Sequence, residues 1–136
     1  MMLGDLLSLH QHKLPVKIIV FSNRALGFVE LEMKAAGILG SGTELVNPDF
    51  AALAKAAGLF AMRVEDPAEL TAAVKAAFDH DGPALVEAVV NRTELSMPPT
   101  IKLDQAIGFN LWALKAVMNG RGDEVIDLAI SNVLRR

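Results

Sequence analysis

Hydrophobic and polar positions follow two alternating periods over the first ninety residues. Continuous β-branched or apolar runs at 16–21, 59–64 and 84–90 are typical of buried strands. Helical spacing predicts helices at 1–12 and 28–36, and two more that begin at Asn47-Pro48-Asp49 and Asp66-Pro67. Strands that alternate with helices of about ten residues predict an α/β fold, a parallel sheet flanked by helices.

The same pattern predicts which side chains are buried. The strand 16–21 follows Pro15 and is expected to be buried on both faces. The expected inward positions of the next helices are Phe50, Leu53, Ala54 and Ala57 in one, and Leu70, Val74 and Phe78 in the other. The glycine-rich stretch 37–46 is expected to be a loop near a ligand, with Thr43-Glu44-Leu45 ordered by a neighbouring subunit.

After Asn91 the pattern changes to helices without a further strand. Met97-Pro98-Pro99 predicts a stiff extended linker. In the first helix that follows, one face carries Leu103, Ile107, Leu111, Leu114 and Met118, while Phe109 and Trp112 lie off it. In the second, an apolar arc is formed by Val125, Ile126, Ala129, Ile130 and Val133. We therefore expect an α/β domain at 1–93 and a helical tail at 94–136.

Composition narrows the function classes. Hydrophobic residues make up 52% and charged residues 21%, which is typical of a folded chain. The net charge of −3 provides no general basic surface for nucleic acid. The absence of cysteine excludes disulfides and thiolate metal sites. No apolar run reaches the roughly 18 residues of a membrane span, and no signal-peptide pattern is present.

Candidate chemistry lies just after the first strand, at Asn23. Ligands of open α/β sheets bind beyond the carboxyl ends of the strands, and an amide oxygen can ligate Mg²⁺. Gly27 permits close backbone approach to a ligand. The alternative is that both residues only form a strand-to-helix turn. The histidines at 10 and 12, and the run Asp79-His80-Asp81, fit helix ends and a solvated turn better than metal sites.

The stretch Val-Phe-Ser-Asn-Arg-Ala-Leu-Gly-Phe-Val-Glu-Leu-Glu-Met-Lys at 20–34 resembles the second half of the thiamine-diphosphate motif. That motif starts with Gly-Asp-Gly and ends at an Asn after a hydrophobic strand. The resemblance is to the pyruvate oxidase and acetolactate synthase superfamily, and within it to the ubiquinone-dependent pyruvate dehydrogenases. It extends over nearly the whole chain. Further matching pieces lie at 2–8, 13–18, 42–45, 98–103 and 120–126.

The resemblance implies a thiamine-diphosphate-binding fold, in its C-terminal part, and an enzyme that oxidatively decarboxylates pyruvate. The products are acetate and CO₂, and electrons pass through FAD to ubiquinone. Asn23 matches the Mg²⁺ ligand, and Ala25 matches the residue whose backbone oxygen completes that ligation. Phe28 matches an aromatic near the electron path, with a core Phe as the alternative. The expected cofactor-binding residues are Asn23, Arg24, Ala25, Leu26, Gly27, Phe28 and Val29.

Departures from the family pattern limit what this chain can do alone. Ser22 replaces a first Asn, and Arg24 replaces a small polar residue. Gly4-Asp5 is not the Gly-Asp-Gly half of the motif, because Leu6 follows it. That half, an activating Glu and the FAD domain are expected upstream of Met1. The isolated 136 residues are therefore expected to be inactive and to bind the cofactor weakly or not at all.

The resemblance also implies a C-terminal membrane-binding tail. An in-plane amphipathic helix buries its apolar face at the lipid boundary, with Trp and Arg near the headgroups. The expected lipid-binding residues are Trp112, Val125, Ile126, Ala129, Ile130, Val133 and Arg135. The expected parent protein is a homotetramer in the cytoplasm, peripheral at the inner face of the cell membrane. The alternatives are a phosphate-dependent pyruvate oxidase, an acetolactate synthase, or a non-catalytic α/β module that docks on membranes or a partner.

Overall fold

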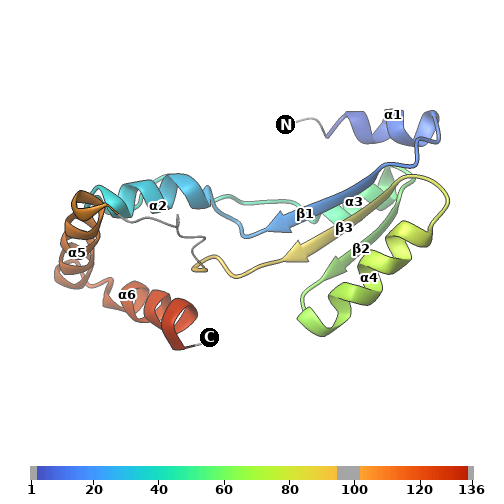
Figure 1. Ribbon diagram of the computed structural model, residues 1–136. Coiled ribbons are helices and arrows are strands. Elements are labelled where there is room, and N and C mark those ends of the chain that lie inside the picture. Colours follow the sequence, from blue (N-terminus) through green and yellow to red (C-terminus); the bar gives the residue numbers. More distant parts are fainter. Residues whose placement is uncertain (1–2, 95–101, 135–136) are drawn as a thin grey trace. The chain divides into compact units, whose positions relative to one another are not determined.

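The computed structural model describes residues 3–94 and 102–134, which form two compact units (Figure 1). Unit 1 comprises Met1–Asn23 and Val46–Val90, and unit 2 comprises Arg24–Leu45 and Asn91–Arg136. The grouping differs from the division expected at 93 and 94, because segment 24–45 packs with the C-terminal helices. Each unit is described by itself below.

Unit 1 is a three-stranded parallel sheet with helices on both faces, as the pattern predicts. The strands are β1 (Lys17–Ser22), β2 (Phe60–Val64) and β3 (Ala84–Val89), in the order β1-β3-β2. Strand β3 lies between the other two and pairs with both in parallel. Lys17 of β1 and Phe60 of β2 both lie opposite Ala84. The helices of this unit are α1 (Asp5–Gln11), α3 (Phe50–Ala56) and α4 (Pro67–Asp79).

Two separate apolar clusters lie on the two faces of this sheet. Leu85 of β3 packs with Leu6 of α1 and Ala54 of α3. Its neighbour Val86 packs with Ala73 and Ala77 of α4. Successive strand residues point to opposite faces, so α1 and α3 cover one face and α4 covers the other. Figure 1 shows α3 and α4 on either side of the strands.

The expectation that the first strand is buried on both faces is wrong. Ile19 and Phe21 of β1 are 37% and 71% exposed. The strand at the centre is β3, and its residues from Ala84 to Ala88 are all buried. Periodicity within a strand reports its apolar character, whereas burial on two faces depends on whether the strand is central or at the edge.

The predicted inward faces of α3 and α4 are also partly wrong. The buried residues are Ala51 and Ala54 in α3 and Ala73 and Ala77 in α4. Leu53 and Phe78 are 39% and 63% exposed. Helices lie close on a sheet when small residues face it, so alanines occupy the contact and the larger side chains flank it.

Unit 2 is helical in its described part. It contains α2 (Gly27–Ala35), α5 (Leu103–Met118), α6 (Gly122–Ala129) and a π-helical turn, η1 (Ile130–Leu134). Its core is Trp112, Ala116 and Leu128, with Phe109 and Val125 packed against it. Where α5 meets α2, a Cβ added to Gly108 would lie 1.9 Å from the Ala35 carbonyl oxygen, so this contact requires glycine.

The predicted apolar face of α5 is exposed. Leu103, Ile107 and Leu114 are 78%, 61% and 59% exposed, and Trp112, expected off that face, is fully buried. The helix turns its Gly108–Trp112–Ala116 side inward, because that side allows close approach to α2 and fills the space with an indole. Met97-Pro98-Pro99, the expected linker, lies outside the described residues.

Candidate functional site

The candidate turn begins where β1 ends. Ser22, the last residue of the strand, is buried, and its carbonyl oxygen accepts a hydrogen bond from the Val90 amide at 3.2 Å. Asn23 follows directly, half-buried, as the last residue of this segment of unit 1. It therefore stands at the carboxyl end of a parallel strand, the position that sequence periodicity predicts and the end of the sheet where α/β proteins bind ligands.

The backbone from Arg24 to Leu26 forms the next part of the turn, in unit 2. Arg24 has a φ of 56°, the left-handed conformation that non-glycine residues adopt rarely. Ala25 is buried and forms an antiparallel bridge with Glu44. The Leu26 amide donates to the Thr43 carbonyl at 2.8 Å, and the Leu45 amide donates to the Arg24 carbonyl at 2.9 Å.

The bridge pairs Thr43-Glu44-Leu45 within the chain, and contact of this segment with a neighbouring subunit stays a prediction. The chain orders the segment itself, by pairing it with residues 24–26. Thr43 is 4% exposed, so the pairing is also covered. Sequence reasoning missed the contact because it joins residues about twenty positions apart without a strand pattern on either side.

The donor atoms of this turn suit a hard cation. The Asn23 amide oxygen and the Ala25 backbone oxygen are neutral oxygen ligands, of the kind that Mg²⁺ accepts when a phosphate supplies the charge. Arg24 is exposed and adds a positive charge beside them along the chain. The residues present therefore fit the metal–diphosphate end of the expected cofactor.

The apolar residues of the turn are exposed. Leu26, Phe28 and Val29 are 44%, 77% and 46% exposed, at the start of α2. The alternative that Phe28 is a core residue opening a helix is therefore wrong. These side chains form an apolar surface beside the turn, as an aromatic ring of a cofactor or substrate would require.

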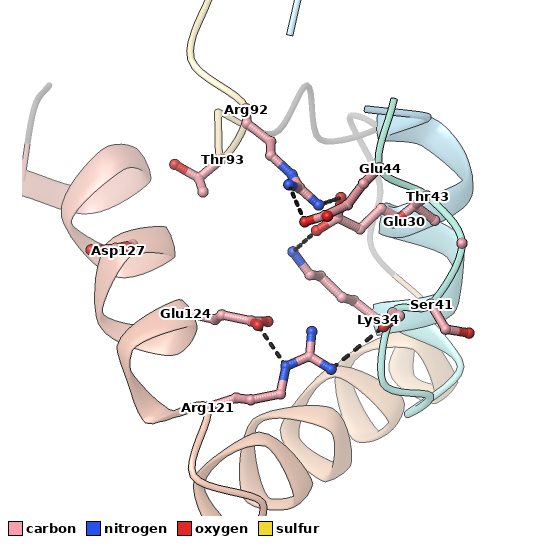
Figure 2. A pocket seen from close by; sticks show the side chains of 12 residues that line it. Glu30, Lys34, Ser41, Thr43, Glu44, Arg92, Thr93, Arg121, Glu124 and Asp127 are labelled. Carbon is pink, nitrogen blue, oxygen red and sulfur yellow. Dashed lines mark hydrogen bonds and ion pairs between the residues drawn. The ribbon is translucent and has the colours of Figure 1, made fainter. Parts of the chain in front are cut away.

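Unit 2 also contains a polar network that sequence reasoning missed (Figure 2). Glu30 of α2 accepts a hydrogen bond from Lys34 at 2.9 Å and pairs with Arg92 at 3.3 Å. Arg92 also pairs with Glu44 at 2.8 Å. The only sequence signal for it was the i, i+4 spacing of Glu30 and Lys34.

Burial raises the pKa of Glu30, but hydrogen bonds from Lys34 and Arg92 and their positive charges outweigh it. The pKa of this carboxyl is therefore held below its usual value of 4.5. The pKa of Arg92 is raised, mainly by its hydrogen bond to Glu44. Lys34 is 5% exposed, and its Nζ lies 5.0 Å from the centre of the Trp112 ring.

This network borders an open cavity of about 550 Å³ within unit 2. Arg121 stands at the opposite side, where its Nε donates to Glu124 at 2.6 Å and its Nη1 to the Gly40 carbonyl at 3.4 Å. The cavity is lined by Glu30, Lys34, Gly40, Ser41, Gly42, Thr43, Glu44, Arg92, Thr93, Arg121, Glu124 and Asp127.

Only some of the expected lipid-binding residues are exposed in the structure. The prediction that Trp112 is a surface residue is wrong, because the helix–helix contact buries it completely. Val125 is half-buried against the same cluster. Ile126 and Ile130 are 60% and 45% exposed, and Ala129 is exposed. The side chain of Val133, and Arg135 altogether, lie outside the described part.

The described residues provide neither a membrane-spanning helix nor a cluster of metal-binding side chains. No helix among them is long and apolar enough to cross a membrane. Nor do residues 3–94 and 102–134 contain a group of three or more His, Cys, Asp or Glu side chains that could hold a metal ion. The His80 ring stacks on Phe60 with a centroid distance of 4.9 Å.

The fold defines an α/β protein with a parallel sheet, and the turn after its first strand is a candidate ligand site. Residues 1–88 match the family described as thiamine pyrophosphate enzyme, C-terminal TPP binding domain. The chain belongs to this family of thiamine-diphosphate enzymes, and its α/β part is their C-terminal cofactor-binding domain.

Individual relatives agree with this assignment. The chain is 32% identical over 115 residues to Bacillus subtilis YdaP, whose provisional name describes it as thiamine pyrophosphate-containing; this covers 85% of the chain and 20% of that protein. It is 34% identical over 114 residues to the mitochondrial acetolactate synthase catalytic subunit of Saccharomyces cerevisiae, covering 81% and 17%. It is 33% identical over 101 residues to the acetolactate synthase large subunit of Pyropia yezoensis, covering 72% and 17%. The chain thus spans a fifth or less of the length of these relatives.

Proposed function

We propose that the protein to which this chain belongs uses thiamine diphosphate with Mg²⁺ to decarboxylate pyruvate. In this proposal two electrons pass through FAD to ubiquinone, so that pyruvate, water and quinone yield acetate, CO₂ and quinol. The observation that supports the cofactor role is the turn at Asn23, at the carboxyl end of β1. The resemblance of 20–34 and 120–126 to quinone-dependent pyruvate dehydrogenases supports the choice of reaction.

Each residue of the turn has a proposed task. The Asn23 amide oxygen and the Ala25 backbone oxygen hold Mg²⁺, while Arg24 adds positive charge near the diphosphate. Leu26, Phe28 and Val29 supply apolar contact on the thiazolium side. When bound, thiamine diphosphate supplies the carbanion chemistry on a 2-oxo acid, and the protein supplies position and electrostatics.

A second candidate reaction is acetolactate synthesis. It is favoured by the names of two relatives described above. Both reactions begin with pyruvate and the same cofactor, so the turn at Asn23 is compatible with either. The difference between them is the fate of the two-carbon unit, which is oxidised in one case and added to a second 2-oxo acid in the other.

The cofactor role is tested by Asn23→Ala in the full-length protein, with Asn110→Ala on the exposed surface of α5 as the control. We expect calorimetric titration with Mg²⁺ and thiamine diphosphate to show at least about tenfold weaker binding for Asn23→Ala and none of that loss for the control. Equal affinity in all three proteins would rule out Asn23 as a ligand.

The reaction is tested with pyruvate and a soluble quinone analogue. Acetate and quinol formed in equal amounts support the proposed oxidation. Acetolactate formed without quinone reduction would replace it with the second candidate, and acetyl phosphate formed only with phosphate would indicate a phosphate-dependent oxidase.

We further propose that the parent protein is a homo-oligomer, a tetramer, at the inner face of the cell membrane, and that lipid contact is made by Ile126, Ala129 and Ile130. The exposed positions of these three residues support the lipid contact. Binding would be mainly hydrophobic, because α6 also carries acidic residues.

A further inference from the structure

We propose that Arg92 is a positioning residue for the metal-binding turn, because it fixes Glu44 and, through Glu44, the backbone of Ala25. The inference rests on the proposed function, since a Mg²⁺ ligand at Ala25 is what makes that backbone position matter. Ala25, Glu44, Arg92 and their partner Glu30 all lie within unit 2.

The turn at Arg24 is strained. Arg24 adopts a φ of 56°, and such conformations persist only where surrounding contacts hold them. Two backbone hydrogen bonds do so here, from the Leu26 amide at 2.8 Å and from the Leu45 amide at 2.9 Å. Because the bridge places Ala25 opposite Glu44, movement of residues 43–45 would move the Ala25 carbonyl with them.

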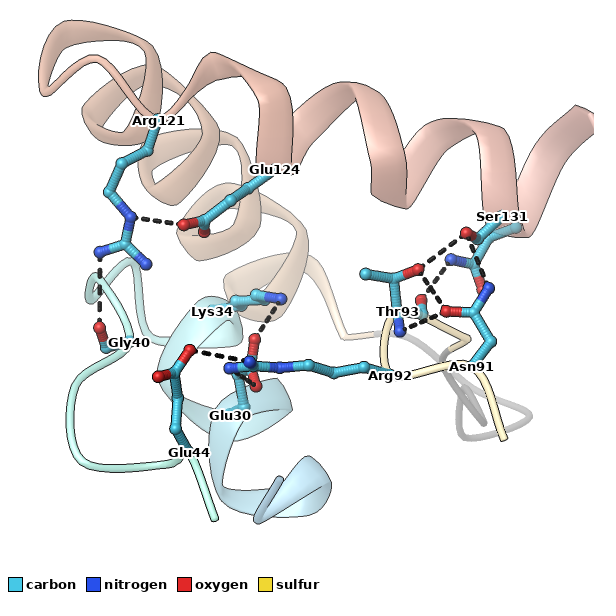
Figure 3. A network of polar contacts seen from close by, with 11 residues as sticks. Glu30, Lys34, Gly40, Glu44, Asn91, Arg92, Thr93, Arg121, Glu124 and Ser131 are labelled. Carbon is cyan, nitrogen blue, oxygen red and sulfur yellow. Dashed lines mark hydrogen bonds and ion pairs between the residues drawn. The ribbon is translucent and has the colours of Figure 1, made fainter. Parts of the chain in front are cut away.

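Arg92 helps to hold residues 43–45, through Glu44. The Glu44 carboxylate is 79% exposed, so without a fixed partner it would be solvated, and its main chain would be held only by the two bridge hydrogen bonds and the burial of Thr43. The Arg92 guanidinium provides that partner at 2.8 Å. Figure 3 shows the Arg92 side chain extended between Glu44 on the loop and Glu30 on α2.

Arg92 is itself held by Glu30. Its second terminal nitrogen pairs with Glu30 at 3.3 Å, and the other oxygen of Glu30 accepts from the buried ammonium of Lys34 at 2.9 Å. Isolated exposed ion pairs contribute little, but here the Arg92 side chain, 37% exposed, also pairs with a carboxylate that is only 15% exposed. Arg92 therefore connects the loop to a fixed point on α2.

The planar guanidinium matters for this connection. Its two terminal nitrogens reach two carboxylates on different segments, whereas a lysine ammonium is a single point charge. We therefore expect Arg92→Lys to retain part of the restraint on Glu44 and Arg92→Met to lose it. The matched control is Arg121→Met. The Arg121 side chain is 38% exposed against 37% for Arg92, it pairs with Glu124, and it donates a hydrogen bond to the Gly40 carbonyl of the same loop.

The experiment compares these variants in the full-length protein by two measurements. Hydrogen exchange of peptides containing Leu26 and Leu45, without cofactor, reports the bridge directly. We expect Arg92→Met to accelerate exchange of these amides by about fivefold, which corresponds to one exposed ion pair in a network. Titration with Mg²⁺ at saturating thiamine diphosphate should show a similar loss of affinity, with kcat at saturating Mg²⁺ within about twofold of wild type.

The outcomes separate this inference from the proposed function. Faster exchange and weaker Mg²⁺ binding in Arg92→Met, with partial recovery in Arg92→Lys and none of the loss in Arg121→Met, support it. If the wild-type protein binds Mg²⁺ and Arg92→Met changes neither the exchange rate nor the Mg²⁺ affinity, the role of Arg92 is overturned and the proposed function is not. A wild-type protein that binds neither Mg²⁺ nor thiamine diphosphate overturns the proposed function and the inference together.

Discussion

Glu30 is the residue at which the polar network of unit 2 converges. Its two carboxylate oxygens accept from Lys34 and pair with Arg92, and its side chain is only 15% exposed. A partly buried carboxylate is stable when cations satisfy both of its oxygens, and it becomes a cost when either partner is removed. The free energy of unfolding should therefore depend on the ionisation of this residue.

The dependence has a definite sign. The pKa of Glu30 in the folded chain lies below the usual 4.5, so the unfolded chain binds more protons near that pH. The stabilisation from Glu30 is present above about pH 4.5 and is lost as the pH falls through the lower folded value. We expect wild type to exceed Glu30→Gln in stability at pH 7, and the difference to shrink as the pH falls below about 4.5, as measured by urea unfolding.

A control on the same helix is Glu32→Gln, an exposed position of α2. Its effect at pH 7 should remain within about 0.5 kcal/mol, as for most surface changes. A Glu30→Gln variant as stable as wild type at pH 7 would contradict the role of the ion pairs.

At the scale of elements, α5 shows that an amphipathic helix can bury a face other than its most aliphatic one. The stripe from Leu103 to Met118 is exposed, while Trp112 and Ala116 are fully buried. The Phe109 and Trp112 rings lie 5.2 Å apart, and the indole also faces the Lys34 ammonium. Trp112 therefore fills the contact between α2, α5 and α6.

This contrast gives a prediction. Trp112→Ala should lower the free energy of unfolding by about 3–5 kcal/mol, because it leaves a large cavity in the core of unit 2. Leu114→Ala, on the exposed face, should cost no more than about 0.5 kcal/mol. Urea unfolding monitored by circular dichroism measures both, and a larger loss for Leu114→Ala would mean that the aliphatic stripe is the buried face after all.

At the scale of the whole molecule, the chain is a small part of the proteins that it resembles. It spans a fifth or less of the relatives compared above. The reaction proposed above is therefore a proposal about the full-length protein, and its tests use that protein.

Membrane association is tested on the same full-length protein. The double variant Ile126→Ser and Ile130→Ser should lose co-sedimentation with phosphatidylcholine vesicles, because binding through the tail would be mainly hydrophobic. Deletion of the tail would be less informative, since it removes Leu128 from the Trp112 cluster.

The matched control changes two aliphatic residues on α5 that are together at least as exposed as Ile126 and Ile130, in Ile107→Ser and Leu114→Ser. It should leave vesicle binding unchanged. Binding that persists in the Ile126 and Ile130 variant would rule out the proposed anchor.

The order of helices and strands, the parallel sheet and the family were all accessible from the sequence. Local periodicity predicted the helices and strands, because the backbone period determines which side chains share a face. The position of Asn23 after a strand and the sequence of the motif around it indicated the family. The exposure of Phe28, by contrast, could not be predicted, because the sequence fits a buried core residue and an exposed one equally well.

Contacts between distant segments were decided only by the tertiary structure. Which strand is central, which face of α5 is buried, and the pairing of Ala25 with Glu44 each depend on partners far along the chain. The network of Glu30, Arg92 and Glu44 joins three segments with no common period. A periodic pattern reports one element's own surface, whereas burial and ion pairing depend on what a second element presents to it.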